Sequence, residues 1–450
     1  MELNCSFRVS TLALFPLALF PLALMCGSCY ANTVSTGGDS DSFNDWLSQG
    51  NIYGEVKTMH FFKEFNGTVA DKQTHAFGGD IQYVSPELYG FSFGVADYAS
   101  WNLGLNPDNS EKTEIYLPAD NINVLGKAYL RYRGYGFNLQ GGRIALDTPF
   151  ANGGEGRTMI PALYEGFGGD YSLLDKQPLK LYGYRIYRFK PFSSDTFDKG
   201  DTGAPEVDDT TIPSVDSDGF STFGLRYGQL YDAQAEAWYY HFDKRAQMAF
   251  VGGELPVHGL SVGHWTPFFG AQYLHEWDTS DQSWPYKNID TDLYSARVGV
   301  RSRNHSFSVI ATHVPSKDGA FLNGAYFAPY NFGIYDTTPI EAGQPLASMI
   351  TSNQPGDALA LRYVYHNQNA LAVLGYTRLN LKDSSGIYYP IAAKDINAGF
   401  MILGYNLTPR LHAEFEFDYI DSPSPVTGDY HAERLRLVYK FGAMMPDSEY

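Results

Sequence analysis

Cysteine is scarce in this sequence, and its positions restrict what it can do. Only three of the 450 residues are cysteines, and Cys5, Cys26 and Cys29 all lie within the first 31 positions. If that segment is removed, the remaining chain has no thiol for a disulfide or for a zinc site built on cysteine. We therefore expect a fold that is held together without disulfides.

Long hydrophobic runs are also absent, except at the amino terminus. Arg8 precedes an apolar stretch at residues 9–25, and small residues follow it. This order is typical of an export signal, so we expect a signal peptide at residues 1–31, cleaved after Ala31, and a single domain at residues 32–450. A retained membrane anchor is the alternative, although prolines interrupt the run and it is shorter than the roughly 20 residues of a membrane helix.

Basic residues are fewer than acidic residues in this sequence. Lys and Arg together number 32 against 50 Asp and Glu, which gives a net charge of −18. Nucleic acid attracts basic surfaces because its phosphates are negative, so we expect no nucleic-acid partner. The acidic residues suit either loops that attract cations or loops that keep the chain soluble during export.

Glycine and aromatic residues are abundant, and they occur in blocks that alternate between apolar and polar positions. The 45 Gly, 34 Tyr and 30 Phe accompany only 18% charged residues, a balance that favours strands. Alternation with a period of two places the apolar residues on one face of a strand and the polar residues on the other. The apolar and polar sets are Leu435, Leu437, Tyr439 and Phe441 against Arg434, Arg436 and Lys440; Leu411, Ala413, Phe415, Phe417 and Tyr419 against His412, Glu414, Glu416 and Asp418; Leu359, Leu361, Tyr363 and Tyr365 against Ala358, Ala360 and Arg362; Tyr294, Ala296, Val298 and Val300 against Arg297 and Arg301; and Gly126, Ala128, Leu130 and Tyr132 against Lys127, Tyr129, Arg131 and Arg133.

Aromatic residues gather at the ends of these blocks, and the segments between blocks differ greatly in length. Residues 190–219 and 316–356 form long connections, whereas residues 134–136 and 367–369 form short ones. Aromatic girdles and long loops at one end are features of transmembrane β-barrels. We therefore predict an all-β fold, a transmembrane antiparallel β-barrel of roughly 16 to 18 strands in contact with outer-membrane lipid, wide enough for a water-filled lumen.

If the apolar face meets lipid, the charged face lines the lumen and supplies basic side chains on several strands. Successive positive sites would lower the barrier for small anionic or zwitterionic solutes, provided that no site holds them too tightly. The alternative is that wall carboxylates such as Glu414, Glu416 and Asp418 neutralise these side chains. The predicted lumen basic ladder comprises Lys127, Arg131, Arg133, Arg297, Arg301, Arg362, Arg434, Arg436 and Lys440.

The stretch from Gln140 to Phe167 is too rich in glycine and proline to continue as one strand. Arg143 and Arg157 bracket a segment that contains Asp147 and Glu155. We predict that these four residues form a pore constriction in which opposite charges face each other, a field suited to a zwitterion. A loop salt bridge that only pins the fold is the alternative.

The same stretch resembles the third-loop region of OprD-type porins, the substrate-specific outer-membrane channels of Gram-negative bacteria. The resemblance rests on Gly142, Arg143, Thr148, Pro149, Glu155, Arg157 and Pro161. It implies an 18-stranded barrel, a monomer or weak homotrimer, that is narrowed by inward-folded constriction loops and conducts amino acids, peptides or aromatic acids. Residues 316–356 stand where that family has a second inward-folding loop, and either Phe441 or Tyr450 would be the terminal aromatic residue read during assembly.

No catalytic constellation is recognisable. The chain contains no Gly-x-Ser-x-Gly turn and no His-Glu-x-x-His pair, and most histidines are scattered singly among strand-like blocks. We expect no enzyme activity, no cofactor and no metal. Two other functions stay open: a plugged adhesive or structural barrel, and a porin for oligosaccharides. The oligosaccharide porin would use aromatic slides built from Trp238, Trp265, Trp277 and Trp284.

Overall fold

The computed structural model describes most of the chain after residue 42. The described residues are 43–106, 117, 120–154, 158–173, 179–199, 204–207, 210–212, 217–228, 232–282, 287–326, 329–330, 354–383, 394–421 and 428–442. The expected signal peptide lies outside them. The chain divides into two compact units, Met1–Trp46 and Leu47–Tyr450, and of the first the structure describes only part of the short helix α2 (Phe43–Ser48). Among the described residues, no helix has the length and apolarity needed to cross a membrane.

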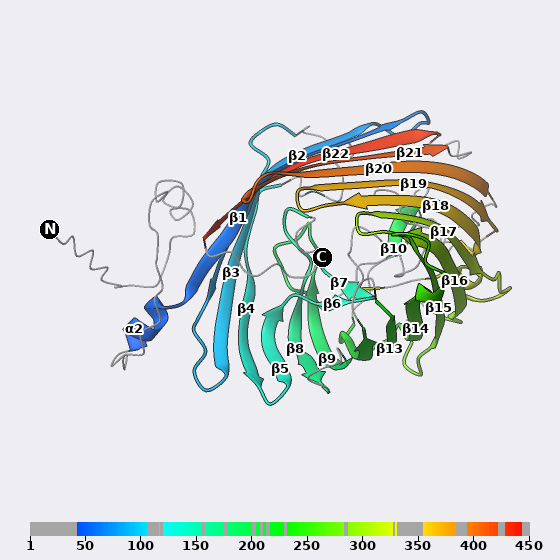
Figure 1. Cartoon of the computed structure of the whole chain (residues 1–450). Coiled ribbons are helices and arrows are strands. Elements are labelled where there is room, and N and C mark those ends of the chain that lie inside the picture. Colours follow the sequence, from blue (N-terminus) through cyan, green and yellow to red (C-terminus); the bar gives the residue numbers. More distant parts are fainter. Residues whose placement is uncertain are drawn as a thin grey trace. The chain divides into compact units, whose positions relative to one another are not determined.

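The second unit is built on one sheet of 18 strands, all paired in the antiparallel sense. The sheet closes on itself because the first strand also pairs with the last, from Tyr53 opposite Gly442 to Phe65 opposite Tyr430. Figure 1 looks into the resulting ring. In chain order the strands are β1 (Asn51–Phe65), β2 (Lys72–Val84), β3 (Phe91–Trp101), β4 (Ile122–Gly134), β5 (Phe137–Ile144), β8 (Leu163–Ser172), β9 (Leu179–Lys190), β12 (Phe220–Tyr227), β13 (Gln234–Phe242), β14 (Ala246–Pro256), β15 (Thr266–Asp278), β16 (Asp290–Arg301), β17 (His305–Val314), β18 (Gly356–His366), β19 (Ala370–Leu381), β20 (Lys394–Thr408), β21 (Leu411–Asp421) and β22 (Tyr430–Gly442). This confirms the predicted all-β barrel, with a strand count at the upper end of the predicted 16 to 18.

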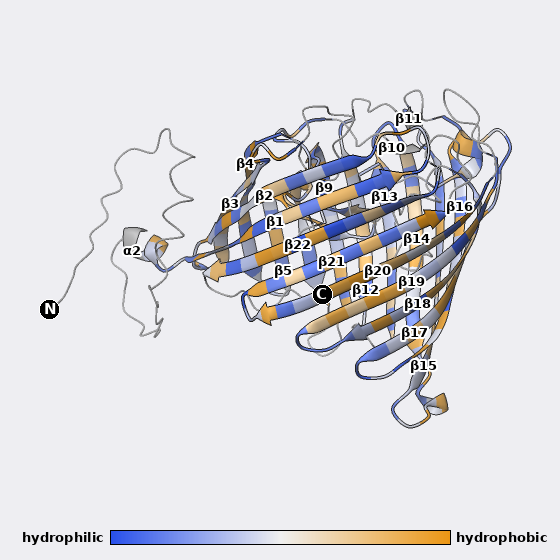
Figure 2. Cartoon of the chain, turned by 90° about the horizontal axis from the view of Figure 1, so that it is seen from above, coloured by the Kyte–Doolittle hydropathy of each residue, from blue (hydrophilic) through white to orange (hydrophobic). Residues whose placement is uncertain are grey.

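The two-residue alternation sorts the side chains between the two faces of the wall. On β22, Leu435, Leu437 and Tyr439 are exposed, whereas Arg434 and Arg436 are buried. A similar division holds on β16, where Val298 and Val300 are exposed and Arg301 is buried. Figure 2 shows how apolar and polar residues are distributed along the wall strands. Apolar side chains therefore cover the outside, as in barrels that stand in a lipid bilayer. The inner face carries polar side chains on some strands and apolar ones on others, such as Tyr240 and Met248 on β13 and β14.

Gly126 departs from the simple alternation. The pairing of β3 with β4 shifts at Ala96 and Asp97, which lie opposite Lys127 and Leu125. Gly126 is the extra residue of this β-bulge, and a bulge turns the side chains that follow it to the other face. A Cβ at Gly126 would meet Tyr98 and Leu163 in the interior, so the prediction that Gly126 shares the outer face with Ala128 is wrong.

The connections are long at one end of the barrel and short at the other. Because neighbouring strands run in opposite directions, every second connection lies at the same end. The connections at residues 145–162, 191–219 and 315–355 share one end, and tight turns such as residues 135–136 and 367–369 lie at the other. This confirms the predicted asymmetry.

Two clusters of buried apolar side chains fill part of the interior. The larger joins inward-facing residues of β13–β16 to segments of the long connections, including Phe150, Tyr326 and Tyr330. The smaller joins inward-facing residues of β1–β4 to Met159 and Ile160. The short strands β6 (Asp147–Thr148) and β7 (Ala151–Asn152) lie within the ring of wall strands (Figure 1).

Candidate constriction and lumen

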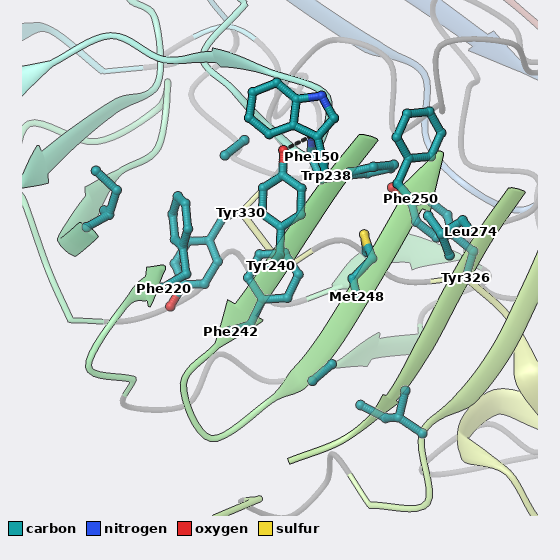
Figure 3. Packing of buried hydrophobic residues seen from close by; sticks show 14 of the residues in the cluster. Phe150, Phe220, Trp238, Tyr240, Phe242, Met248, Phe250, Leu274, Tyr326 and Tyr330 are labelled. Atoms are coloured by element: carbon teal, nitrogen blue, oxygen red, sulfur yellow. Dashed lines mark hydrogen bonds between the residues drawn. The ribbon is translucent and has the colours of Figure 1, made fainter. Parts of the chain in front are cut away.

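The connection between β5 and β8, residues 145–162, folds into the barrel and is anchored first on the β13–β14 side. Phe150 has no exposed surface. Its ring meets Tyr240 and Phe250 edge-on, with centroids 5.5 and 5.2 Å apart. The Tyr240 hydroxyl accepts a hydrogen bond of 3.4 Å from the Phe150 backbone N–H (Figure 3). This arrangement fixes the tip of the connection to the inner wall.

A second anchor holds the same connection on the opposite side of the ring. The Lys57 ammonium on β1 donates a hydrogen bond of 3.1 Å to the Thr158 carbonyl oxygen and also pairs with Glu55 at 2.5 Å. Met159 and Ile160, both fully buried, join the apolar cluster of β1–β4. β1 and β13 stand on opposite sides of the ring in the strand order. The connection is therefore held on both sides of the lumen, and we call its described residues, 145–154 and 158–162, the crossing loop.

The long connection between β17 and β18 packs against the crossing loop. Tyr326 meets Phe150 edge-on at 6.0 Å, and the Tyr330 carbonyl oxygen accepts a hydrogen bond of 2.9 Å from Tyr164. Near its start, Lys317 pairs with Asp292 at 2.6 Å. In its described part, this connection therefore folds inward as predicted.

Charged groups of the crossing loop and the wall meet at Arg226 on β12. Its guanidinium lies 3.4 Å from Asp147 and 3.1 Å from Glu236 on β13. Its carbon also lies 5.4 Å from the ring centroid of Trp238, a cation–π distance. The Asp147 side chain remains 83% exposed although it belongs to a loop inside the ring. Water therefore reaches this charged group within the barrel.

Of the four predicted constriction residues, Arg143 and Asp147 are described, and they have different partners. Arg143 on β5 lies opposite Ala128 on β4 and Glu165 on β8. It is on the outward face, which also carries exposed Leu139 on β5 and Phe167 on β8. Its guanidinium lies 3.5 Å from Glu165, donates to the Leu125 carbonyl oxygen and stacks on Phe197. Asp147 instead pairs with Arg226. Glu155 and Arg157 lie outside the described residues, so their role stays a prediction.

Four members of the predicted basic ladder form ion pairs with wall carboxylates. Arg297 and Arg301 on β16 share Glu254, at 3.5 and 2.5 Å. On β22, Arg436 lies 2.9 Å from Glu414, and Arg434 lies 2.5 Å from Glu416. The second interpretation made from the sequence, neutralisation by carboxylates that include Glu414 and Glu416, describes this part of the wall.

The other five members have different surroundings. Arg131 stacks on Tyr129 and donates to its hydroxyl at 3.1 Å. The Lys127 ammonium lies 3.5 Å from the Gln82 amide oxygen, and Arg362 stacks on Phe400. Arg133, which lies 3.5 Å from Glu87, and Lys440 stand at the short-turn end. Among the described ion pairs, none joins Arg131 to a carboxylate.

Sequence reasoning missed Lys57 and Arg226, two basic residues that contact the crossing loop. The signal for Arg226 was present, because it alternates with Phe223, Leu225 and Tyr227 in the same way as the recognised blocks. Its partner Asp147 is 79 residues away in the chain. Only the closed ring brings such distant segments into contact.

No family model matches the chain, and no curated protein matches its sequence. Solved structures do share its fold. OpdK of Pseudomonas aeruginosa with vanillate is 16% identical with a TM-score of 0.68 and covers 88% of this chain and 100% of its own. OccAB3 of Acinetobacter baumannii is 16% identical with a TM-score of 0.70 over the same shares. OccK8 (OprE) of P. aeruginosa is 13% identical with a TM-score of 0.68, covering 89% and 100%. The resemblance to OprD-type porins is thus confirmed at the level of the fold.

Proposed function

We propose that this chain is an outer-membrane porin of the OprD type, through which small polar, carboxylate-bearing solutes diffuse. The observation that carries the proposal is the crossing loop, which is anchored on opposite walls and still leaves Asp147 exposed to water. A loop in this position narrows the lumen without filling it. The protein acts as a monomer or weak homotrimer in the outer membrane of a Gram-negative bacterium and performs no catalysis.

Arg131 is the basic residue best suited to meet a solute carboxylate. Arg297, Arg301, Arg434 and Arg436 already have carboxylate partners. Arg131 instead combines a guanidinium with the adjacent Tyr129 ring, and a guanidinium binds carboxylates through paired hydrogen bonds. An aromatic acid would satisfy both groups. OpdK, which shares this fold, was crystallised with vanillate, an aromatic carboxylate, and this supports the same solute class here.

Swelling of liposomes that contain the protein tests this assignment. Vanillate or benzoate should enter wild-type liposomes faster than benzyl alcohol of similar size, and Arg131→Ala should remove most of that difference. Arg133→Ala is the matched control, because Arg133 is exposed at the short-turn end beside Glu87. Equal swelling by benzoate in wild type and Arg131→Ala would contradict the role of Arg131. Arg143→Ala and Arg157→Ala test the predicted constriction in the same assay, and unchanged swelling in both would refute it.

The absence of any pore would refute the function itself. In planar bilayers, the folded wild-type protein should give steady single-channel currents that depend on the permeant anion. A plugged adhesive or structural barrel would give none.

The tryptophans do not favour an oligosaccharide porin. Trp265 and Trp277 lie with the outward set, where Trp265 stacks near exposed Phe307 and Trp277 stacks on His275. Trp238 faces inward but is only 3% exposed. Trp284 lies outside the described residues. The described tryptophans therefore provide no aromatic slide along the lumen.

A further inference from the structure

The outer face of β15–β19 contains a groove in the otherwise bulky apolar surface. Its volume is about 630 Å³, within the size range of pockets that hold small ligands. Three alanines on adjacent strands, Ala271, Ala296 and Ala311, lie opposite one another in register and form its floor. Strands β17–β19 face the viewer in Figure 2.

Larger side chains border the alanine floor on both sides. The next row toward the short turns contains Phe269, Val298 and Val309, all exposed. The next row toward the long connections begins with Tyr273 and Tyr294, whose ring centroids are 5.1 Å apart. It continues with the polar groove residues His313, Asp357 and Asn380. The floor is therefore a trough one row high, bounded by apolar residues on one side and by a mixed aromatic and polar row on the other.

The alanine row ends in a positive charge. It continues through Leu359 on β18 to Arg378 on β19, and both residues line the groove. Arg378 is exposed, and no described ion pair or hydrogen bond engages its side chain. The nearby carboxylates have other partners, since Asp357 lies 2.7 Å from His313 and Asp395 accepts a hydrogen bond of 2.6 Å from Asn380.

An arginine at the end of an apolar trough matches one kind of molecule, a lipid whose phosphate meets the guanidinium while an acyl chain lies on the alanines. Guanidinium groups bind phosphate in a bidentate manner, and the small alanine side chains let an acyl chain approach the wall closely and pack against it. We infer that this groove binds one phosphate-bearing membrane lipid, held by Arg378 at the headgroup and by the alanine floor along the chain. The inference rests on the proposed function, since it requires this face to stand in lipid.

Native mass spectrometry of the full-length mature protein in detergent, with phosphatidylglycerol as the probe, tests the inference. The wild type should retain one phosphatidylglycerol. Ala296→Phe, which fills the floor, and Arg378→Gln, which removes the charge, should each weaken retention at least fivefold. Diacylglycerol with the same chains should bind wild type and Arg378→Gln equally weakly. The matched controls are Ala413→Phe, on the outer face of β21, and Arg303→Gln, in an exposed turn, and both should retain the lipid as the wild type does.

Equal retention in the wild type and both groove variants would overturn the inference, as would equal retention of diacylglycerol and phosphatidylglycerol by the wild type. A change of oligomeric state in Ala296→Phe with unchanged lipid retention would also overturn it, because the groove would then hold a second copy of the chain. Planar-bilayer currents from the same samples separate the two proposals. A conducting wild type without lipid retention refutes only the groove, whereas lipid retention without conduction refutes only the channel.

Discussion

Phe150 fixes the tip of the crossing loop, so its removal should widen the pore. The side chain is fully buried and contacts three rings, those of Tyr240, Phe250 and Tyr326. Truncation of a buried Phe to Ala costs about 3–5 kcal/mol. At about 1.4 kcal/mol for each factor of ten, this raises the population of the detached loop at least about 100-fold.

Single-channel recording in planar bilayers measures the effect directly. Phe150→Ala should give a larger and noisier conductance than the wild type, because the β13–β14 anchor is weakened while the Lys57 anchor on β1 remains. Phe223→Ala is the control, since Phe223 is exposed on the outer face of β12. The reasoning is refuted if Phe150→Ala folds, inserts and conducts with wild-type amplitude and noise.

Two other predictions concern the wall. Leu437→Arg places a charge on the outer face of β22, where Leu437 is 37% exposed. It should destabilise the inserted barrel by about 2–4 kcal/mol at mid-bilayer, which urea unfolding in lipid vesicles measures. Equal stability of Leu437→Arg and Leu437→Val would argue against a lipid-facing position. Glu414→Gln removes the carboxylate 2.9 Å from Arg436 and should cost about 3–5 kcal/mol while shifting the reversal potential toward anion selectivity. An unchanged reversal potential would show that Arg436 does not face the permeant ions.

The wall was predictable from the sequence because its rule is local. Each of these strands needs an apolar face and a polar face. The two-residue period of Leu435, Leu437 and Tyr439 predicts which residues share the apolar face without knowledge of any neighbouring strand. Gly126 shows where this local rule stops being sufficient. The face of Gly126 was predicted wrongly because a β-bulge depends on how two strands pair, and a single block of sequence does not reveal that pairing.

The interior was less predictable because its contacts join distant segments. The sequence indicated that the stretch at residues 140–167 does not continue as one strand and contains an inward-folded loop. It did not show that residues 140–144 and 163–167 belong to wall strands β5 and β8, nor which wall residues receive the loop. Charge alone suggested that Arg143 faces Asp147, whereas register places Arg143 beside Glu165 and ring closure brings Arg226 to Asp147. The neutralisation of Arg434 by Glu416 likewise depends on register between β21 and β22.

The wall's reliance on backbone pairing has a consequence for sequence divergence. Ladder hydrogen bonds are made by groups that every residue except proline carries, so selection can exchange almost any side chain that keeps its polarity. This accounts for how OpdK and OccK8 share this fold at 16% and 13% identity. Likeness between barrels of this kind is therefore easier to detect from strand number and register than from identical residues.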